Sequence, residues 1–364
     1  MAGTVQCLAG WWVVRRFTRV AASPEPTIPP AVLLLKPLHG DEPLLEAALA
    51  TACAQDYPSL RIVCGVNSPT DPAIAIVHRL QQRFPECRIT LVINPTQHGL
   101  NHKVANLINM LAVIPPPAPD EVVVIADSDI HAAPDCLRHV VAALAQPGTG
   151  LVTTLYTGLA ARIGVVEFLG CTAITHSFLP GALLARAIGR QDCLGATMAL
   201  RADTLTAIGG LPALANHLAD DNELGRLVRA RGLSVALAAT IPATTVAEYR
   251  FADLLSHELR WARTIRALVP AAFALSAIQY PIAWAILALA LTGQDWALAV
   301  LALAWAARVM ASRGIDRALG PAASTPVPTA LLPLRDVLSL GLVIAAYAGR
   351  RVRWRGAELE FPPR

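Results

Sequence analysis

The stretch Glu121-Val-Val-Val-Ile-Ala-Asp-Ser-Asp129 joins an apolar, strand-forming run directly to two aspartates. Carboxylates are costly to bury without partners, so such a pair at the end of a strand indicates a bound cation. In an open α/β sheet, ligands bind at the carboxyl ends of the strands. The stretch therefore predicts an α/β fold with a substrate site beside Asp127 and Asp129. A strand that ends in a solvated turn is the alternative at this point.

Strand-like and helix-like segments alternate on both sides of this stretch. Apolar strands are expected at 31–35, 60–66, 89–93, 151–155 and 235–238. Helical spacing is seen at 43–53, 73–84, 103–111, 134–145 and 217–231. Such alternation predicts a Rossmann-like, mostly parallel sheet with helices on both faces. Residues 195–201 are expected to return to the site as a strand or loop.

The composition points to a membrane rather than to nucleic acid. Apolar residues make up 54% of the 364 residues and charged residues only 15%, which is unusual for a soluble protein. Residues 267–294 contain no Asp, Glu, Lys or Arg and are long enough to cross a bilayer. Shorter apolar runs follow at 296–307 and 337–349. Arginines flank this tail and no nucleic-acid motif appears, so we expect a lipid bilayer as partner and no nucleic acid.

An amphipathic helix is expected just before the apolar tail. Projection of residues 251–266 and the next turn places Leu254, Trp261, Ile265 and Leu268 on one face. Arg260, Arg263 and Arg266 fall on the other face, a pattern typical of a helix in the membrane interface. We therefore expect an N-terminal interfacial or partial anchor segment with a linker at 1–30, with Trp11 and Trp12 at headgroup level. Three further parts are expected after it: a catalytic α/β domain at 31–250, the interfacial helix at 251–266 and a membrane region at 267–364.

Four polar features lie along the first 265 residues: Asp71, the pair Asp127 and Asp129, the pair Asp220 and Asp221, and the segment 257–261. The strand-end carboxylates among them can converge on one edge of the sheet. Asp71 is expected at a nucleotide base or ribose, and Asp127 at a ribose or sugar. Asp129 is expected to hold Mg²⁺ or Mn²⁺ on a diphosphate, where the metal neutralises the leaving charge. Asp221 is expected to take the proton from an attacking hydroxyl.

Each remaining candidate has two possible roles on sequence grounds. Arg260, with Trp261 beside it, is expected to hold the diphosphate or order the acceptor, while Lys103 is either a phosphate or base contact or the start of a surface helix. Asp220 either competes with Asp221 for the role of base or is a solvated helix charge, and the alternative for Asp71 is an Asx turn before Pro72. His102, His131 and His217 are interpreted as satisfied polar residues.

A set of motifs in this order resembles family 2 and family 21 glycosyltransferases, specifically the ceramide glucosyltransferase-like group, and most of all bacterial hopanoid biosynthesis-associated glycosyltransferases. The motifs cover roughly residues 30 to 270. They are Leu35-Lys-Pro-Leu-His-Gly-Asp-Glu-Pro43, Gln55-Asp-Tyr-Pro58, Asp71-Pro-Ala73, Asn101-His-Lys-Val-Ala-Asn-Leu107, Asp127-Ser-Asp-Ile130, Gly195-Ala-Thr-Met198, Leu218-Ala-Asp-Asp221 and His257-Glu-Leu-Arg-Trp261.

The resemblance implies a GT-A fold, a UDP-sugar donor, a divalent metal, inversion at the sugar and a lipid acceptor. The hopanoid branch implies transfer of N-acetylglucosamine to a polyol such as bacteriohopanetetrol, at the cytoplasmic face of the bacterial inner membrane. Gly195, Thr197, Asp220 and His257 are expected to support the acceptor side. His257 departs from the Gln or Arg usual at the start of the last motif.

The membrane topology follows from the arginines. Arg260 to Arg266 should be cytoplasmic, Asp295 on the far side, and Arg308 to Arg317 cytoplasmic again. Prolines and the Arg335-Asp336 pair interrupt the last apolar run, so a re-entrant or interfacial hairpin is expected at 318–349. It would keep the arginine cluster at 350–355 in the cytoplasm.

Other activities fit the sequence less well. A ceramide- or sterol-type glucosyltransferase using UDP-glucose shares the motifs. A haloacid dehalogenase-type phosphatase also uses Asp-x-Asp after a strand, but there the motif usually opens the domain. The chain offers too few spans for a processive polysaccharide synthase, and a non-catalytic lipid-binding scaffold does not need the full set of carboxylates.

Overall fold

The structure is a computed structural model that describes residues 1–321, 324–326, 328–348, 351–354 and 357–360. The chain divides into two compact units. The α/β unit comprises Thr18–Thr157 and Ala185–Thr245. The helical unit comprises Met1–Phe17, Gly158–Leu184 and Val246–Arg364.

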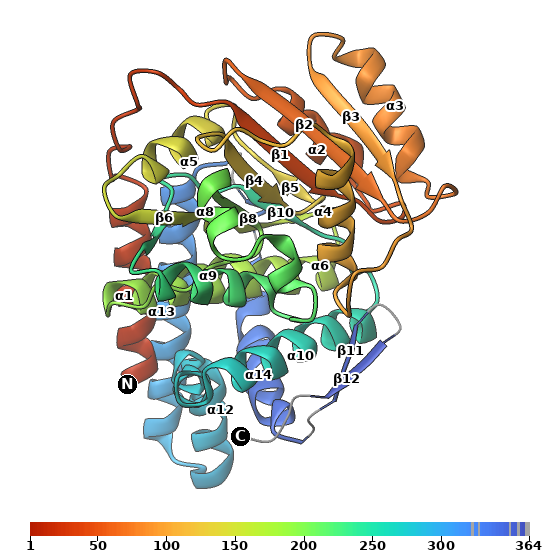
Figure 1. The fold of residues 1–364 in the computed structure, drawn as a ribbon. Coiled ribbons are helices and arrows are strands. Elements are labelled where there is room, and N and C mark those ends of the chain that lie inside the picture. The colour runs from red at the N-terminus through yellow and green to blue at the C-terminus, as the bar shows by residue number, and fades with distance from the viewer. Residues whose placement is uncertain (322–323, 327, 349–350, 355–356, 361–364) are drawn as a thin grey trace. The chain divides into compact units, whose positions relative to one another are not determined.

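A seven-stranded sheet forms the centre of the α/β unit, in the order β3-β2-β1-β4-β8-β6-β9 (Figure 1). Its strands are β1 (Val32–Pro37), β2 (Leu60–Val66), β3 (Arg88–Ile93), β4 (Val122–Ala126), β6 (Thr149–Thr153), β8 (Thr197–Arg201) and β9 (Ser234–Leu237). Pairing is parallel except at β8, which runs antiparallel to both of its neighbours. The predicted mostly parallel α/β sheet is therefore confirmed, and residues 195–201 do return as a strand beside β4.

Helices cover both faces of this sheet because successive side chains of each buried strand point to opposite faces. Val32 and Leu34 of β1 pack into one core and Leu33 and Leu35 into the other. The first core also holds residues of α2 (Leu45–Cys53), α3 (Ala73–Arg83) and α5 (Cys136–Leu144). The second holds residues of α4 (His102–Val113), α8 (Ala202–Ala207), the 3-10 helix Leu211–Leu214 and α9 (Asp220–Ala230).

Three short strands were not anticipated from the sequence: β5 (Ile130–His131), β7 (Thr157–Ala160) and β10 (Ala243–Val246). β5 pairs antiparallel with β10, with Ile130 opposite Thr244. These strands have two to four residues and lack an apolar run, so nothing in the sequence distinguishes them from loops. β5 directly follows the Asp127-Ser128-Asp129 turn, so its pairing places β10 beside that turn.

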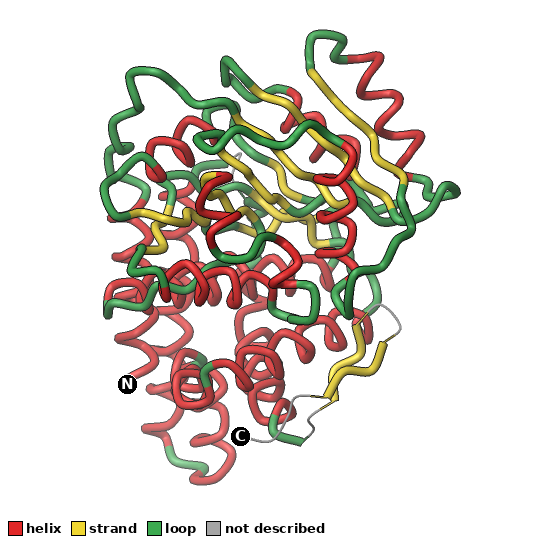
Figure 2. The backbone as a smooth tube through the Cα atoms, in the orientation of Figure 1, coloured by secondary structure: helices red, strands yellow, loops and turns green. Residues whose placement is uncertain are grey.

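The second unit is helical, as Figure 2 shows by colour. Its helices are α1 (Ala2–Phe17), α6 (Val165–Ala173), the π-helix Ile174–Phe178, α7 (Leu179–Ala187), α10 (Phe251–Leu268), α11 (Pro270–Leu275), α12 (Pro281–Thr292), α13 (Asp295–Leu319) and α14 (Leu332–Ala346), with 3-10 turns at Ser276–Gln279 and Thr329–Leu331. A two-stranded ribbon, β11 (Arg351–Trp354) and β12 (Ala357–Glu360), follows.

The expected span at 267–294 is not one straight helix in the structure, although its two helices together remain apolar enough for a broken span or a re-entrant loop. The segment is bent by 69° between Pro270–Gln279 and Pro281–Thr292. Pro281 has no backbone N–H and clashes with the preceding turn, so a straight helix cannot pass through it. α13 continues well beyond Ala307, the end of the second apolar run, to Leu319.

Within the described residues, three helical segments are long and apolar enough to cross a membrane, or four if the bent pair counts as one span. The three are Val165–Ala187, Asp295–Leu319 and Thr329–Ala346. The first was expected only as a helix. The segment 318–349, expected as a hairpin, contains one continuous helix with Arg335 and Asp336 inside it rather than at an interruption. Membrane orientation stays a prediction, and Arg350 and Arg355 lie outside the described residues.

The N-terminal helix packs along α13. A Cβ at Gly314 would lie 2.2 Å from Trp11 Nε1, so the indole occupies the space that the missing side chain leaves. Of the two tryptophans on α1, Trp12 is the exposed one, at 58% exposure. Trp11 therefore contacts protein, whereas both residues were expected at headgroup level.

Candidate functional site

Asp127 and Lys103 form the centre of the candidate site in the α/β unit. Asp127 follows β4, and its backbone N–H donates to Ala196 O at 3.0 Å. Lys103 Nζ lies 2.6 Å from Asp127 Oδ1. Asn101 caps α4, because its side-chain oxygen accepts from Lys103 N at 3.0 Å and Val104 N at 3.1 Å. The cap therefore fixes the first turn that carries Lys103.

The Asp220-Asp221 pair opens α9 against the same lysine. Asn101 Nδ2 donates to Asp220 Oδ1 at 3.3 Å, and Lys103 Nζ lies 3.9 Å from Asp220 Oδ2. Among the described residues, no donor forms a hydrogen bond to that second oxygen, although it is buried. Asp221 Oδ1 accepts from Asn222 N at 2.7 Å. Asp127, Lys103 and Asp220 thus form one contiguous charged cluster, with Asp221 next to it in the chain.

Gly195 lies directly against Asp221. A Cβ at this position would be 3.1 Å from Asp221 Oδ2, a contact tighter than most real ones. Glycine therefore leaves room beside the one Asp221 oxygen that the Asn222 N–H does not engage. Thr197 is buried at the start of β8 and opposite Ala126 of β4, and its carbonyl accepts from Thr153 Oγ1 at 3.1 Å.

Two carboxyl groups of the site have raised pKa values. Burial, and then the charge of Asp220, raise the pKa of Asp221 to about 6, against a partial opposing effect of Lys103. Burial, and then the charge of Asp127, raise the pKa of Asp129 to about 6. Thr244 Oγ1 opposes this shift by donating to Asp129 Oδ2 at 2.5 Å. The charge of Asp127 raises the pKa of both Asp129 and Asp221, so the three carboxyl groups interact electrostatically.

Several residues of the site were not singled out from the sequence. Lys36 is buried in β1 and donates to Asp127 O at 2.8 Å. Burial lowers its pKa, against the charges of Asp129 and Asp127. Burial and the charge of Asp221 raise the pKa of Tyr156. A lysine inside an apolar strand was the available signal for Lys36, whereas Tyr156 and Thr244 carry none.

Asp71 does not join this cluster in the structure. Its two oxygens accept from Gly40 N at 3.0 and 3.1 Å, and Oδ1 also accepts from Ala73 N at 2.9 Å. The carboxylate therefore ties the end of β2 to the loop after β1 and starts α3, as the Asx-turn alternative requires. Its predicted contact with a base or ribose stays a prediction.

The last motif belongs to the helical unit, on α10. The imidazole of His257 contacts the carboxylate of Glu248 and meets the Trp261 ring edge-on, with centroids 4.6 Å apart. Glu258 forms an ion pair with Arg335. The roles predicted for His257, Arg260 and Trp261 stay predictions.

The three histidines interpreted as polar neighbours lie in ordinary surroundings. His131 Nε2 pairs with Thr245 Oγ1 at 2.9 Å, and burial lowers its pKa. His217 Nε2 lies 3.8 Å from Glu223, and the carbonyl of His102 faces Asn67 Nδ2 at 3.5 Å.

A cleft of about 770 Å³ lies at the opposite edge of the same sheet. It is lined by the first residues of three strands, Val32, Leu60 and Arg88, together with Glu121 before β4. Since the carboxylate cluster lies at the other ends of β1 and β4, the two are separate features.

The model of Glycosyl transferase family 21 matches residues 1–363. The chain belongs to this family. A ceramide glucosyltransferase of Komagataella phaffii is 31% identical over 99 residues, covering 26% of this chain and 19% of that protein. Ceramide glucosyltransferase 1 of Caenorhabditis elegans is 22% identical over 247 residues, covering 68% of this chain and 52% of that protein. The chain thus spans about half the length of its curated relatives at most.

The fold has a solved counterpart. A mannosyltransferase from Pyrobaculum calidifontis, determined with GDP-Man and Mn²⁺, superposes with a TM-score of 0.57 over 95% of both chains at 20% identity. At this identity the likeness establishes the fold alone. The family 21 chain therefore has the GT-A-like fold that its motifs predicted.

Proposed function

We propose that this family 21 chain is an inverting glycosyltransferase that moves a sugar from a UDP-sugar to a hydroxyl of a membrane lipid. The observation that carries the proposal is the cluster in which Lys103 bridges Asp127 and Asp220 next to Asp221. Strand-end and helix-start residues from distant parts of the chain meet there, at the edge of an α/β sheet where ligands bind.

Asp221 is the proposed general base. Its pKa of about 6 keeps it ionised at neutral pH while leaving it basic enough to accept a proton. As the lipid oxygen forms its bond to the anomeric carbon, the O–H proton passes to Asp221. The bond from that carbon to the diphosphate oxygen breaks, and its electron pair leaves with UDP. A single displacement of this kind inverts the anomeric configuration.

Asp129 is the proposed ligand for Mg²⁺ or Mn²⁺. Among the described residues, no group of three or more His, Cys, Asp or Glu side chains is arranged to hold a metal. Cations of this type are often held by one or two carboxylates plus substrate phosphates, so a single aspartate fits a site that the donor completes. Its raised pKa, caused by burial and by Asp127, also supports a cation there. Such a metal would supply charge neutralisation for the departing diphosphate.

Lys103 and Asp127 are proposed to contact the donor. Burial lowers the Lys103 pKa, but the charges of Asp127 and Asp220 outweigh this effect and raise it. The lysine is therefore a permanent cation held between carboxylates. Asp71 is proposed at the base or ribose, and Gly195, Thr197 and Asp220 are proposed to support the acceptor side.

The acceptor is proposed to be a hopanoid polyol such as bacteriohopanetetrol, and the sugar N-acetylglucosamine. The motif resemblance supports this choice, and the three apolar helical segments support an acceptor within a bilayer. Ceramide- or sterol-type glucosylation with UDP-glucose is the second candidate, favoured by the two ceramide glucosyltransferases that the chain resembles. We place the α/β unit on the cytoplasmic side of a bacterial inner membrane, where UDP-sugars are made.

A two-way panel tests the proposal. Membranes holding the full chain are incubated with UDP-N-acetylglucosamine or UDP-glucose, each with a hopanoid polyol, ceramide or sterol, and glycolipids are detected by mass spectrometry. We expect product from UDP-N-acetylglucosamine and the polyol. Product only from UDP-glucose with ceramide or sterol would favour the second candidate. A folded chain that forms none would support the non-catalytic scaffold.

A further inference from the structure

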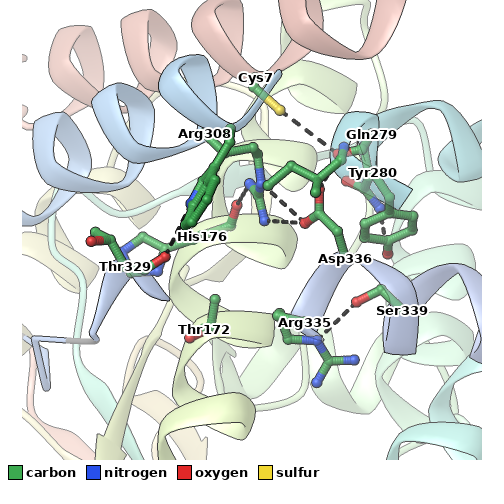
Figure 3. Close-up of polar contacts among 12 residues, drawn as sticks. Cys7, Thr172, His176, Gln279, Tyr280, Arg308, Thr329, Arg335, Asp336 and Ser339 are labelled. Atoms are coloured by element: carbon green, nitrogen blue, oxygen red, sulfur yellow. Dashed lines mark hydrogen bonds and ion pairs between the residues drawn. The ribbon is translucent and has the colours of Figure 1, made fainter. Parts of the chain in front are cut away.

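Two adjacent charged residues in the helical unit are almost completely buried and extend toward different helices. Arg335 is 1% exposed and Asp336 is not exposed at all, both in the second turn of α14. Figure 3 shows them leaving the same helix, Arg335 beside Ser339 and Asp336 toward Arg308. Buried ionisable residues within an apolar helical unit are expensive, so their partners indicate what they do.

Arg335 holds the helix that carries the last sequence motif. Its Nη1 and Nη2 donate to the two Glu258 oxygens, each at 2.8 Å, in a bidentate pair. Nε donates to Ser339 Oγ at 2.9 Å, and Nη1 also approaches Leu169 O at 3.4 Å. Glu258 is the second residue of the motif His257-Glu-Leu-Arg-Trp261. It follows His257, whose ring contacts Trp261, and precedes Arg260 and Trp261, which are predicted to act on the donor.

Asp336 holds α14 itself in place. Its Oδ1 accepts from Arg308 Nε at 3.1 Å and lies 2.9 Å from Arg308 Nη2 on α13. Its Oδ2 accepts from Ile282 N at 3.2 Å, in the first turn of α12. That N–H has no acceptor within its own helix, and Tyr280 at the cap position offers no side-chain bond. Asp336 therefore caps α12 from another helix.

These contacts set register rather than add stability. A buried ion pair is often no more stabilising than an apolar pair of similar volume, yet it fixes one geometry. α10 and α14 also share an apolar cluster with Leu259, Ala262, Val343 and Ala346, and apolar contacts of this kind are not directional. The planar fork of Arg335 on Glu258 is directional, since both hydrogen bonds fail if the helices shift.

We propose that Arg335 is a positioning residue for sugar transfer: it fixes the α10 motif through Glu258, while Asp336 anchors α14 to Arg308 and to the start of α12. Neither residue touches substrate in this scheme. The inference rests on the proposed function, because it assigns the motif a part in the reaction.

The test replaces the ion pair without leaving a buried charge. In the full chain, Arg335→Met is combined with Glu258→Leu, which keeps volume and removes both charges. We expect a folded protein with a melting temperature near the wild type. Its kcat should fall by about 10- to 100-fold, the scale of a small misplacement, with little change in KM for the UDP-sugar. Arg313→Lys, at an exposed position on α13, is the matched control and should leave kcat unchanged.

A second measurement does not depend on activity. The protein has seven tryptophans, so fluorotryptophan labelling gives a small ¹⁹F spectrum in which Trp261→Phe assigns one resonance. Arg335→Lys keeps the charge but loses the fork, and we expect it to shift or broaden the Trp261 resonance. The Arg313→Lys control should not.

The outcomes separate the two ideas. An unchanged Trp261 resonance in Arg335→Lys, or a folded Arg335→Met/Glu258→Leu protein with wild-type kcat, would overturn the positioning role. If the wild type transfers no sugar while Trp261 still responds to Arg335→Lys, the proposed function fails and the structural coupling stands.

Discussion

The two charge clusters of this protein differ in how their charges are balanced. In the α/β unit, Asp129 and Asp221 have raised pKa values, and the buried Asp220 Oδ2 accepts no hydrogen bond from the described residues. In the helical unit, Arg335 and Asp336 direct their charged atoms at partners 2.8 to 3.2 Å away. We propose that the cluster with excess negative charge accepts a cation or ligand, whereas the buried ion pairs of the helical unit fix its helices.

The largest expected effect is on the site with unbalanced charge. Asp221→Asn should lower kcat by about 10²- to 10⁴-fold, because the amide cannot accept the acceptor proton. Asp220→Asn should cost less, since that carboxylate is not the proposed base. Transfer of radiolabelled sugar, normalised to folded protein, measures both. Equal losses in the two variants would remove the distinction between them.

Breaking the buried ion pairs of the helical unit should affect stability instead. Asp336→Asn leaves Arg308 buried without its counter-charge, and we expect a loss of about 3–5 kcal/mol in unfolding free energy. Arg308→Met combined with Asp336→Asn removes both charges and keeps an acceptor for Ile282 N, so it should recover most of the loss. Unfolding midpoints in detergent measure the difference. A double variant as unstable as Asp336→Asn alone would show that the pair itself stabilises the fold.

Metal removal tests whether the charge cluster of the α/β unit needs a bound cation for activity. Chelation should abolish transfer, and Mg²⁺ or Mn²⁺ should restore it. Asp129→Asn should lower kcat on the order of 10²-fold, because charge on the leaving diphosphate is less well neutralised. Asp135→Asn, at an exposed position before α5, is the control. Full activity in chelator would contradict the role of Asp129.

The smallest effect is a pH-dependent change in stability. Asp221 has a pKa of about 6 in the fold against an ordinary value of 3.8, so the folded state holds this proton more tightly. Its ionisation therefore destabilises the fold, an effect absent below about pH 4 and complete above about pH 6. Asp221→Asn should raise the melting temperature at about pH 7.5 and leave it unchanged at about pH 4.

The same ionisation should control activity in the opposite direction. Wild-type kcat/KM should rise with pH through about 6, as Asp221 becomes able to accept a proton. Initial rates across that range measure this. A flat profile, or equal melting temperatures of wild type and Asp221→Asn at both pH values, would refute the raised pKa.

Long apolar runs made the main sheet predictable from the sequence. β1, β2 and β4 are largely buried on both faces, and their sequences are apolar apart from Lys36 in β1 and Arg61 in β2. β5 has only two residues, and its pairing with β10 depends on chain segments about 110 residues apart, so no local pattern marks it. Pro281 was visible, but the hydropathy of 267–294 concealed the bend that it causes.

The partners of the charged residues were also only partly predictable from the sequence. The position of Asp127 and Asp129 directly after β4 was enough to predict a candidate site there, because strand ends share an edge. Asp71 has its partners in a loop and not in the cluster, which spacing cannot show. Arg335 and Asp336 were interpreted as an interruption of an apolar run, since only the folded structure supplies Glu258 and Arg308 as partners.

The configuration of the sugar linkage in the product tests the central claim most directly. If Asp221 assists a single displacement on an α-linked UDP-sugar, nuclear magnetic resonance of the glycolipid should show only the β linkage. An α-linked product would require a different arrangement of catalytic groups and would contradict the account.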